Sequence, residues 1–193
     1  MRTVAALYVD PRGPYPKMPG VECWDEARDA RNYAGPHPVV AHPPCGPWGD
    51  MAHLCKNQPR DLAPRAVGQV QCWGGVLEHP KRSRLWKALG LPLPGEGHDR
   101  LGGYTVEIEQ VDWGHKCRKP TWLYVVGADR ALIPQRAPGT PTHAIFYGAW
   151  ERSGHAGAPL LAASREIRRR TPPAFAELLV SLARESTRQR AVG

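Results

Sequence analysis

The sequence predicts an α/β domain with a mostly parallel sheet of about five or six strands. Three observations lead to this fold class. The 193 residues are enough for one domain with a real core. Short strand-like runs alternate with helix-like patterns along the chain. The 21 prolines and 20 glycines indicate many turns and short elements rather than long helices.

Strand-like composition is found in residues 3–9, 38–42, 75–78, 104–110 and 121–126. Residues 104–110 alternate apolar and polar side chains, which is typical of a strand with one buried face. The sequence TWLYVV at 121–126 is a continuous apolar run, which predicts a central strand.

Helix-like patterns lie between these strands. Residues 61–73 form one of them, with Asp61 as a candidate N-cap. Residues 83–89 form a short helix that ends at Gly90, and residues 25–33 are another short candidate. The clearest helix pattern lies near the C-terminus.

The C-terminal helix has both a start signal and an apolar face. Thr171 is a suitable N-cap, and Pro172 fits the first turn. One face is apolar at helical spacing, formed by Phe175, Leu178, Leu179 and Leu182.

One domain is expected over residues 1–185, and residues 186–193 are expected to form a frayed tail. Residues 128–163 lack periodicity and are rich in glycine, proline and aromatic residues, which indicates an irregular insertion or a region that contacts the target. The candidates for such contacts are His143, Phe146, Tyr147 and Trp150.

The chain is basic, with a formal net charge of +8 and a pI of about 9.5. A polyanionic partner explains this charge, and nucleic acid is the commonest one, although a basic surface can also serve solubility alone. Residues 164–190 contain seven arginines and no lysine, which favours phosphate contacts, although a solvated helix face has the same composition.

No apolar run of about 18 residues is present, so no transmembrane helix is expected. The N-terminal segment MRTVAALYVDP lacks the long apolar core and cleavage site of a signal peptide, so we expect a cytoplasmic protein. The five cysteines are an odd number, which argues against a disulfide framework. We expect Cys23, Cys72 and Cys117 to pack as small core residues.

Cys45 is the strongest candidate for chemistry. It lies in VVAHPPCGPWG at 39–49, where an apolar strand leads into two prolines and the cysteine. Prolines restrict the backbone, glycines let a ligand approach it, and ligands bind beyond the carboxyl ends of parallel strands. The motif predicts a thiol held at the active edge of the sheet; a structural turn with an inert cysteine is the alternative.

Two later segments supply candidate partners for Cys45. Glu78 ends the strand in GGVLEHP at 74–80, and a carboxylic acid beside a ring nitrogen can act as a general acid. Arg118 lies in a basic turn within 110–127, and its planar guanidinium can bind a phosphate or a base oxygen. Taken singly, an exposed glutamate and a solvated hairpin explain these residues as well.

The order of these motifs resembles that of the DNA cytosine-C5 methyltransferases. PPC at Cys45 is similar to their motif IV, and the strand ending in Glu78 is similar to motif VI. DWGHKCRKPTWLYVVG is similar to motif VIII, and RTPPAFAELLVSLA at 170–183 is similar to motif X. The resemblance covers residues 38–127 and 165–183.

The resemblance implies a reduced Rossmann-like fold and base flipping, with Cys45 adding to C6 of an extruded pyrimidine in DNA. Glu78 would act as the acid at ring nitrogen N3, and Arg118 would steady the ring oxygen or a phosphate. The other expected substrate contacts are Pro44, Trp48, His79 and Lys119. Of these, Trp48 is expected to stack on the base. His42 or a helix N-terminus is expected to lower the pKa of Cys45.

The part of the family's fold that binds the cofactor has only a weak counterpart in this chain. Family members cradle S-adenosylmethionine in a glycine-rich loop after the first strand. No GxG motif follows the first strand here, and Asp10 and Gly13 are the weak candidates for cofactor contacts. The long target-recognition domain is missing as well, and such compact relatives suit bacteriophage genomes and therefore a host cytoplasm.

Three alternatives stay open. The covalent chemistry at C6 can act on a 5-substituted pyrimidine of phage DNA without S-adenosylmethionine. A non-catalytic nucleic-acid-binding decoy would keep the pocket and the basic surface. A zinc site is the third, with the candidates His42, Cys45, His53 and Cys55. Their spacing is unlike the paired Cys-x-x-Cys of structural zinc sites, so no metal is expected.

Overall fold

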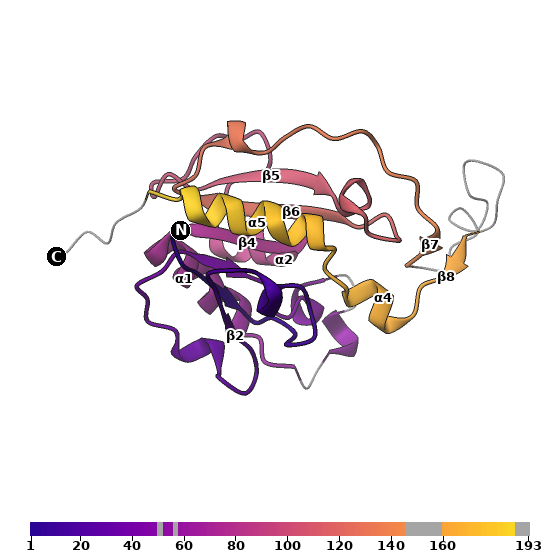
Figure 1. Cartoon of the computed structure of the whole chain (residues 1–193), viewed down its shortest axis with the longest axis horizontal. Coiled ribbons are helices and arrows are strands. Elements are labelled where there is room, and N and C mark those ends of the chain that lie inside the picture. Colours follow the sequence, from indigo (N-terminus) through magenta and orange to yellow (C-terminus); the bar gives the residue numbers. More distant parts are fainter. Residues whose placement is uncertain (50–51, 56–57, 146–159, 188–193) are drawn as a thin grey trace.

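Six strands form one mixed sheet in the order β2-β1-β3-β4-β6-β5 (Figure 1). The strands are β1 (Val4–Leu7), β2 (Val21–Trp24), β3 (Val39–Ala41), β4 (Gly75–Pro80), β5 (Tyr104–Glu109) and β6 (Pro120–Val126). β1 to β4 are parallel to one another, whereas β6 is antiparallel to both of its neighbours, β4 and β5. This computed structural model describes residues 1–49, 52–55, 58–145 and 160–187.

Helices cover both faces of the sheet. Those in the described residues are α1 (Leu62–Trp73), α2 (Arg84–Leu89), α4 (Arg165–Arg169) and α5 (Pro173–Glu185). In Figure 1, α5 crosses one face, and α1 and α2 lie behind the sheet. No helix in the described ranges combines the length and the apolar character needed to cross a bilayer.

Two apolar clusters form the core, one on each face of the sheet. The cluster under α5 contains Val4, Ala6, Val40, Val76, Leu123 and Val125 from the strands. The cluster under α1 and α2 contains Ala5, Leu7, Val39, Ala41, Leu77 and Tyr124. Successive residues of each strand alternate between the clusters, because side chains of a strand point to opposite faces. The predicted apolar face of the C-terminal helix, which includes Phe175 and Leu182, is buried in the first cluster.

The α/β class is therefore confirmed, but the predicted mostly parallel arrangement stops at β4. The connection from Glu109 to Pro120 is shorter than the crossover of about a dozen or more residues that parallel neighbours need, so β5 and β6 pair antiparallel. β2 was not predicted. Its side chains are all partly exposed at the edge of the sheet, and edge strands have weaker apolar patterns than central ones.

Three helix predictions need correction. Residues 25–33 form only a 3-10 turn, η2 (Ala30–Asn32), because Asp29 adopts a left-handed φ of 55° and caps that turn. Asp61 precedes α1, but its side chain makes no capping hydrogen bond. The N-cap position of α5 is Pro172 rather than Thr171. Pro172 is itself followed by a proline, the first residue of α5, and this drives Pro172 out of the helical region.

The predicted C-terminal tail begins later than residue 186. Ser186 is buried, and its hydroxyl donates to the carbonyl of Val126 at 2.9 Å. The N–H of Thr187 donates to the carbonyl of Gly127 at 2.9 Å. Both residues are therefore tied to the end of β6, and residues 188–193 lie outside the described ones.

The irregular region predicted at 128–163 is only partly described. Its described parts include the short strands β7 (His143–Ala144) and β8 (Leu161–Ala162), which pair in parallel. The expected contact residues Phe146, Tyr147 and Trp150 lie outside the described residues.

Candidate active site

The segments that carry Cys45 and Glu78 come together where the parallel strands end. The register of β3 and β4 pairs Val40 with Val76, and both pack under α5. Two residues later along each strand, His42 and Glu78 lie on the same face, since every second side chain shares a face. The two segments that carry the predicted motifs are therefore neighbours in space.

Both carboxylate oxygens of Glu78 are hydrogen-bonded. His42 donates from Nδ1 to Oε2 at 3.0 Å, and Gln110 donates from Nε2 to Oε1 at 3.0 Å. The hydroxyl of Thr121 lies 3.5 Å from Oε1 and accepts a bond of 2.8 Å from Gln110. Groups from three separate segments thus fix the orientation of the carboxylate.

Tyr15 extends this arrangement into the core. Its hydroxyl lies 2.5 Å from Nε2 of His42, and its ring is buried in the cluster under α5. Because His42 donates from Nδ1 to Glu78, a neutral ring has Nε2 as its acceptor, and the Tyr15 hydroxyl donates. The result is a chain of hydrogen bonds from Tyr15 through His42 to Glu78.

Glu78 is ionised in spite of its burial. Burial alone would raise its pKa, but the charge of Lys119 and the hydrogen bond from His42 outweigh burial and lower the pKa to about 2. The side chains of His42 and Glu78 remain 12% and 11% exposed, so the pair is not fully closed off from solvent.

Cys45 lies at the same edge, before the 3-10 turn η3 (Gly46–Trp48). The residue is exposed. Burial of its thiol group raises the pKa of Cys45, and the charge of Glu78 raises it further, whereas Lys119 lowers it. The expected lowering of this pKa by His42 or a helix N-terminus is therefore wrong for this structure, since both ring nitrogens of His42 are engaged elsewhere.

Lys119 rather than Arg118 is the cation of this site. Lys119 is partly buried at the entrance to β6, and its charge acts on both Glu78 and Cys45. Arg118 is exposed, and its charge acts on Glu109 instead. Consecutive residues of an extended segment point to opposite sides, so the role predicted for one falls to its neighbour.

His79 faces away from Glu78 and is fully buried on the opposite face of the sheet. Its ring lies 6.3 Å from that of Trp86, and within the described residues neither of its ring nitrogens has a hydrogen-bond partner. Burial lowers the pKa of His79 to about 4, although Glu78 and the nearby backbone of Pro44 act in the opposite direction. In this structure His79 therefore does not face the substrate edge.

Trp48 is also buried, with 9% of its surface exposed. It packs in the cluster under α1, and the guanidinium of Arg60 lies 5.3 Å from its ring centroid. Its ring is therefore not free to stack on a base in this structure. Pro44 is exposed beside Cys45 and stays a candidate for substrate contact.

Asp10 and Gly13 do not form a cradle for S-adenosylmethionine. Asp10 is exposed and paired with Arg12 at 2.9 Å. Gly13 does not adopt a left-handed φ, and a Cβ added to it would lie 3.0 Å from the carbonyl oxygen of Asp10. The loop after β1 sends the Tyr15 side chain toward the site instead. The residues present here do not fit that cofactor.

In the part of the chain that the structure describes, no group of three or more His, Cys, Asp and Glu side chains could hold a metal ion. Among the residues considered for zinc, His42 is bonded to Glu78, and His53 is exposed. The thiol of Cys55 lies beside Gly46, since a Cβ added there would be 2.8 Å from its sulfur.

Three residues of the site were not predicted: Tyr15, Gln110 and Thr121. Tyr15 lies in a proline-rich loop without periodicity, and nothing in its local sequence indicates a partner. Gln110 directly follows β5 and Thr121 lies at the start of β6, so the antiparallel pairing of those strands was the missing signal.

No protein-family model matches this chain. A search of curated proteins finds no match either. The resemblance to the cytosine-C5 methyltransferases therefore rests on the motifs and on the residues described above.

Proposed function

We propose that Cys45 of this chain adds covalently and reversibly to ring carbon C6 of pyrimidine bases in DNA, on a Rossmann-like fold of the cytosine-C5 methyltransferase type. One observation carries the proposal. Cys45 is exposed just beyond β3, and Glu78 and Lys119 lie close enough to act on its charge. In open α/β sheets, ligands bind beyond the carboxyl ends of the parallel strands, and Cys45 lies at such an end.

The chemistry needs a thiolate, an acceptor of electrons and a proton. The thiolate of Cys45 adds to C6, the electron pair of the C5–C6 double bond moves to C5 and into the ring, and C5 takes a proton from water. In the reverse direction C5 loses a proton and the thiolate leaves, so the C5 hydrogen exchanges with solvent. The charge of Lys119 supports this step because it stabilises both the thiolate and the electron-rich ring.

Glu78 supports the step as a hydrogen-bond acceptor rather than as the expected acid at N3. Its pKa of about 2 keeps it ionised at neutral pH, and an ionised carboxylate only accepts hydrogen bonds. Glu78 can accept a bond from the amino group of cytosine, and it orients His42.

Methyl transfer is not part of the proposal, because the loop with Asp10 and Gly13 does not fit S-adenosylmethionine. A 5-substituted pyrimidine of phage DNA is also a possible substrate under this proposal, since the thiolate attacks C6 whichever group C5 carries. The base must leave the stack in either case, because C6 is not accessible inside a duplex.

The test uses an oligonucleotide that contains a 2-pyrimidinone base, which is readily attacked at C6 and forms a lasting adduct. Mass spectrometry of the intact protein should show the adduct on wild type and on Cys72→Ala, which removes a cysteine that is exposed and not, as expected, packed in the core. It should show none on Cys45→Ala. An adduct on Cys45→Ala, or no adduct on any of the three while DNA still binds, contradicts the proposed chemistry.

The same samples with S-adenosylmethionine test the cofactor. We expect no change in the mass or the yield of the adduct. A product that is heavier by one methyl group would show that the β1 loop binds the cofactor in spite of its geometry.

A non-catalytic DNA binder is a second proposal, and the raised pKa of Cys45 favours it. The thiolate is the reactive form of cysteine, and a raised pKa reduces its amount at neutral pH. This proposal predicts that Cys45→Ala binds an oligonucleotide as tightly as wild type and that no adduct forms.

A further inference from the structure

A short basic helix borders the Cys45 site. α4 begins after Ser164, whose hydroxyl accepts a bond of 3.2 Å from the N–H of Ile167. The Nε2 of His115 lies 3.1 Å from the carbonyl oxygen of Ile167, and its Nδ1 accepts from the N–H of Cys117 at 3.0 Å. Nε2 therefore carries the proton and donates to Ile167. Buried His115 thus attaches α4 to the turn that leads into β6.

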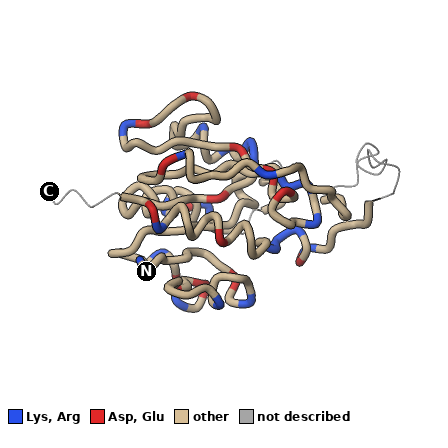
Figure 2. The backbone as a smooth tube through the Cα atoms, turned by 45° about the horizontal axis from the view of Figure 1, so that its top comes forward, with Lys and Arg blue, Asp and Glu red and all other residues tan. Residues whose placement is uncertain are grey.

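This attachment places the arginines of α4 beside the site. The charge of Arg169 acts on Cys45, and that of Arg168 acts on Cys117. Lys119, from the turn before β6, acts on both cysteines. Figure 1 shows α4 at the end of the molecule toward which β5 points, and Figure 2 shows several Lys and Arg residues around that end.

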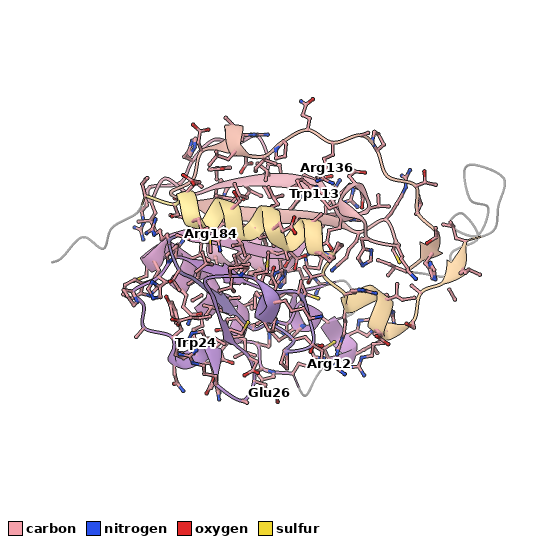
Figure 3. All side chains as sticks on the ribbon, viewed as in Figure 1. Arg12, Trp24, Glu26, Trp113, Arg136 and Arg184 are labelled. Atoms are coloured by element: carbon pink, nitrogen blue, oxygen red, sulfur yellow. The ribbon has the colours of Figure 1, made fainter. Side chains whose placement is uncertain are left out.

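In the described residues no carboxylate is in direct ion contact with these cations, although the charge of Lys119 acts on Glu78. Within the described ranges, Lys119, Arg168 and Arg169 form no ion pair with an N···O distance of 4.0 Å or less. The acidic residue of α4, Glu166, acts on Arg12 of the loop after β1, which Figure 3 labels near the same end. Unpaired cations from separate segments around one exposed cysteine attract a polyanion.

We infer that the phosphates of a DNA strand bind Lys119, Arg168 and Arg169, and that the substrate is a polynucleotide rather than a free nucleotide. This inference deepens the proposed function and rests on it for the choice of DNA. A nucleoside monophosphate carries a single phosphate group, whereas a strand presents one at every nucleotide and can contact cations from both segments. Phosphate contacts position a strand without reading its sequence.

The experiment measures the binding of a fluorescent single-stranded oligonucleotide by anisotropy over a range of salt concentrations. The test variant carries Arg168→Gln and Arg169→Gln together. The control variant carries Arg100→Gln and Arg130→Gln, which remove the same charge from exposed positions next to the other end of β5 and β6. Excess deoxycytidine monophosphate serves as the competing free nucleotide.

We expect the test variant to bind more weakly and its slope of log affinity against log salt to be smaller by about 1.4, since each phosphate contact on a single strand contributes about 0.7. The control variant should keep the wild-type slope, and the nucleotide should not displace the oligonucleotide. The inference is overturned if both variants change alike, if the slope is unaffected, or if the nucleotide competes on equal terms.

The result separates this inference from the proposed function. Cys45→Ala should retain the full salt slope, because the phosphate contacts do not involve the thiol. A normal slope with no 2-pyrimidinone adduct would leave the inference standing and overturn the covalent chemistry. A 2-pyrimidinone adduct together with an unchanged salt slope in the arginine variant would support the covalent chemistry and overturn the inference about the phosphate contacts.

Discussion

Nδ1 of His42 donates a hydrogen bond of 3.0 Å to Oε2 of Glu78, although 36 positions of sequence separate the two residues. The contact arises because β3 and β4 are adjacent and parallel, so that their ends meet at one edge. It connects the segment that leads into Cys45 with a buried charge in β4. Changes at this pair therefore report on how the candidate site is held together.

Glu78→Gln should destabilise the protein by about 1–3 kcal/mol. The substitution keeps the shape but removes the charge, and it turns one acceptor oxygen into a donor that faces the donor of either His42 or Gln110. The free energy of unfolding in urea measures the loss. Glu177→Gln, on the exposed side of α5, should stay within about 0.5 kcal/mol of wild type. Equal losses in both variants would contradict the assigned network.

Tyr15→Phe should also destabilise the protein by about 1–3 kcal/mol, because Nε2 of His42 loses its partner in a nearly closed environment. The ring nitrogen shifts of His42 in a 15N NMR spectrum should change, and those of His115 should not. Tyr104→Phe is the matched control, since the buried hydroxyl of Tyr104 has no hydrogen-bond partner in the described residues. A Tyr104→Phe variant that is as unstable as Tyr15→Phe would argue against the chain.

Stability should fall as the pH decreases from about 6.5 to about 4. The pKa of His79 is lowered to about 4 in the folded chain, whereas an unfolded histidine has a pKa of about 6.5. The unfolded chain binds the proton more readily in this window, so protonation favours unfolding, by about 3 kcal/mol at most from this residue. The pKa of His115 is lowered as well, which adds to the effect in the same direction.

His79→Leu tests the source of this pH dependence. The variant should have a flatter profile between about pH 6.5 and 4, with little change of stability at pH 7, because a buried imidazole without hydrogen bonds is replaced by an apolar side chain. Below about pH 4.5 both proteins should lose stability as Glu78, with its pKa of about 2, takes up a proton on unfolding. An unchanged slope between pH 6.5 and 4 would exclude His79 as the cause.

Two glycines should respond to alanine in opposite ways. Gly68→Ala, at an exposed position in α1 where an added Cβ meets nothing within 4 Å, should stabilise the protein by about 0.5–1 kcal/mol. Gly75→Ala should prevent normal folding, since its φ is +117° and the Cβ would lie 1.9 Å from the carbonyl oxygen of Val39. Thermal melts of the two variants check this. Similar melting temperatures would show that the contact between β3 and β4 is looser than described.

Local patterns predicted the elements of this fold better than their arrangement. The alternation of apolar and polar residues predicted β5, and the apolar helix face that includes Phe175 predicted α5. Both patterns arise because burial of one face of an element makes its sequence periodic. The direction of β6 leaves no such trace, since an apolar run reads the same both ways. α4 is too short for a periodic pattern, and it depends on His115, far away in the sequence.

The α/β class, the basic charge, and a cysteine and a glutamate at the ends of two strands could be inferred from the amino-acid sequence alone. The folded chain was needed to show that Lys119 rather than Arg118 acts on Cys45, that Tyr15 and Gln110 belong to the same network as Glu78, and that His79 and Trp48 are buried away from the site. The physical reason is that composition and periodicity follow from local burial. Strand direction, register and long-range hydrogen bonds depend on segments that meet only after the chain has folded.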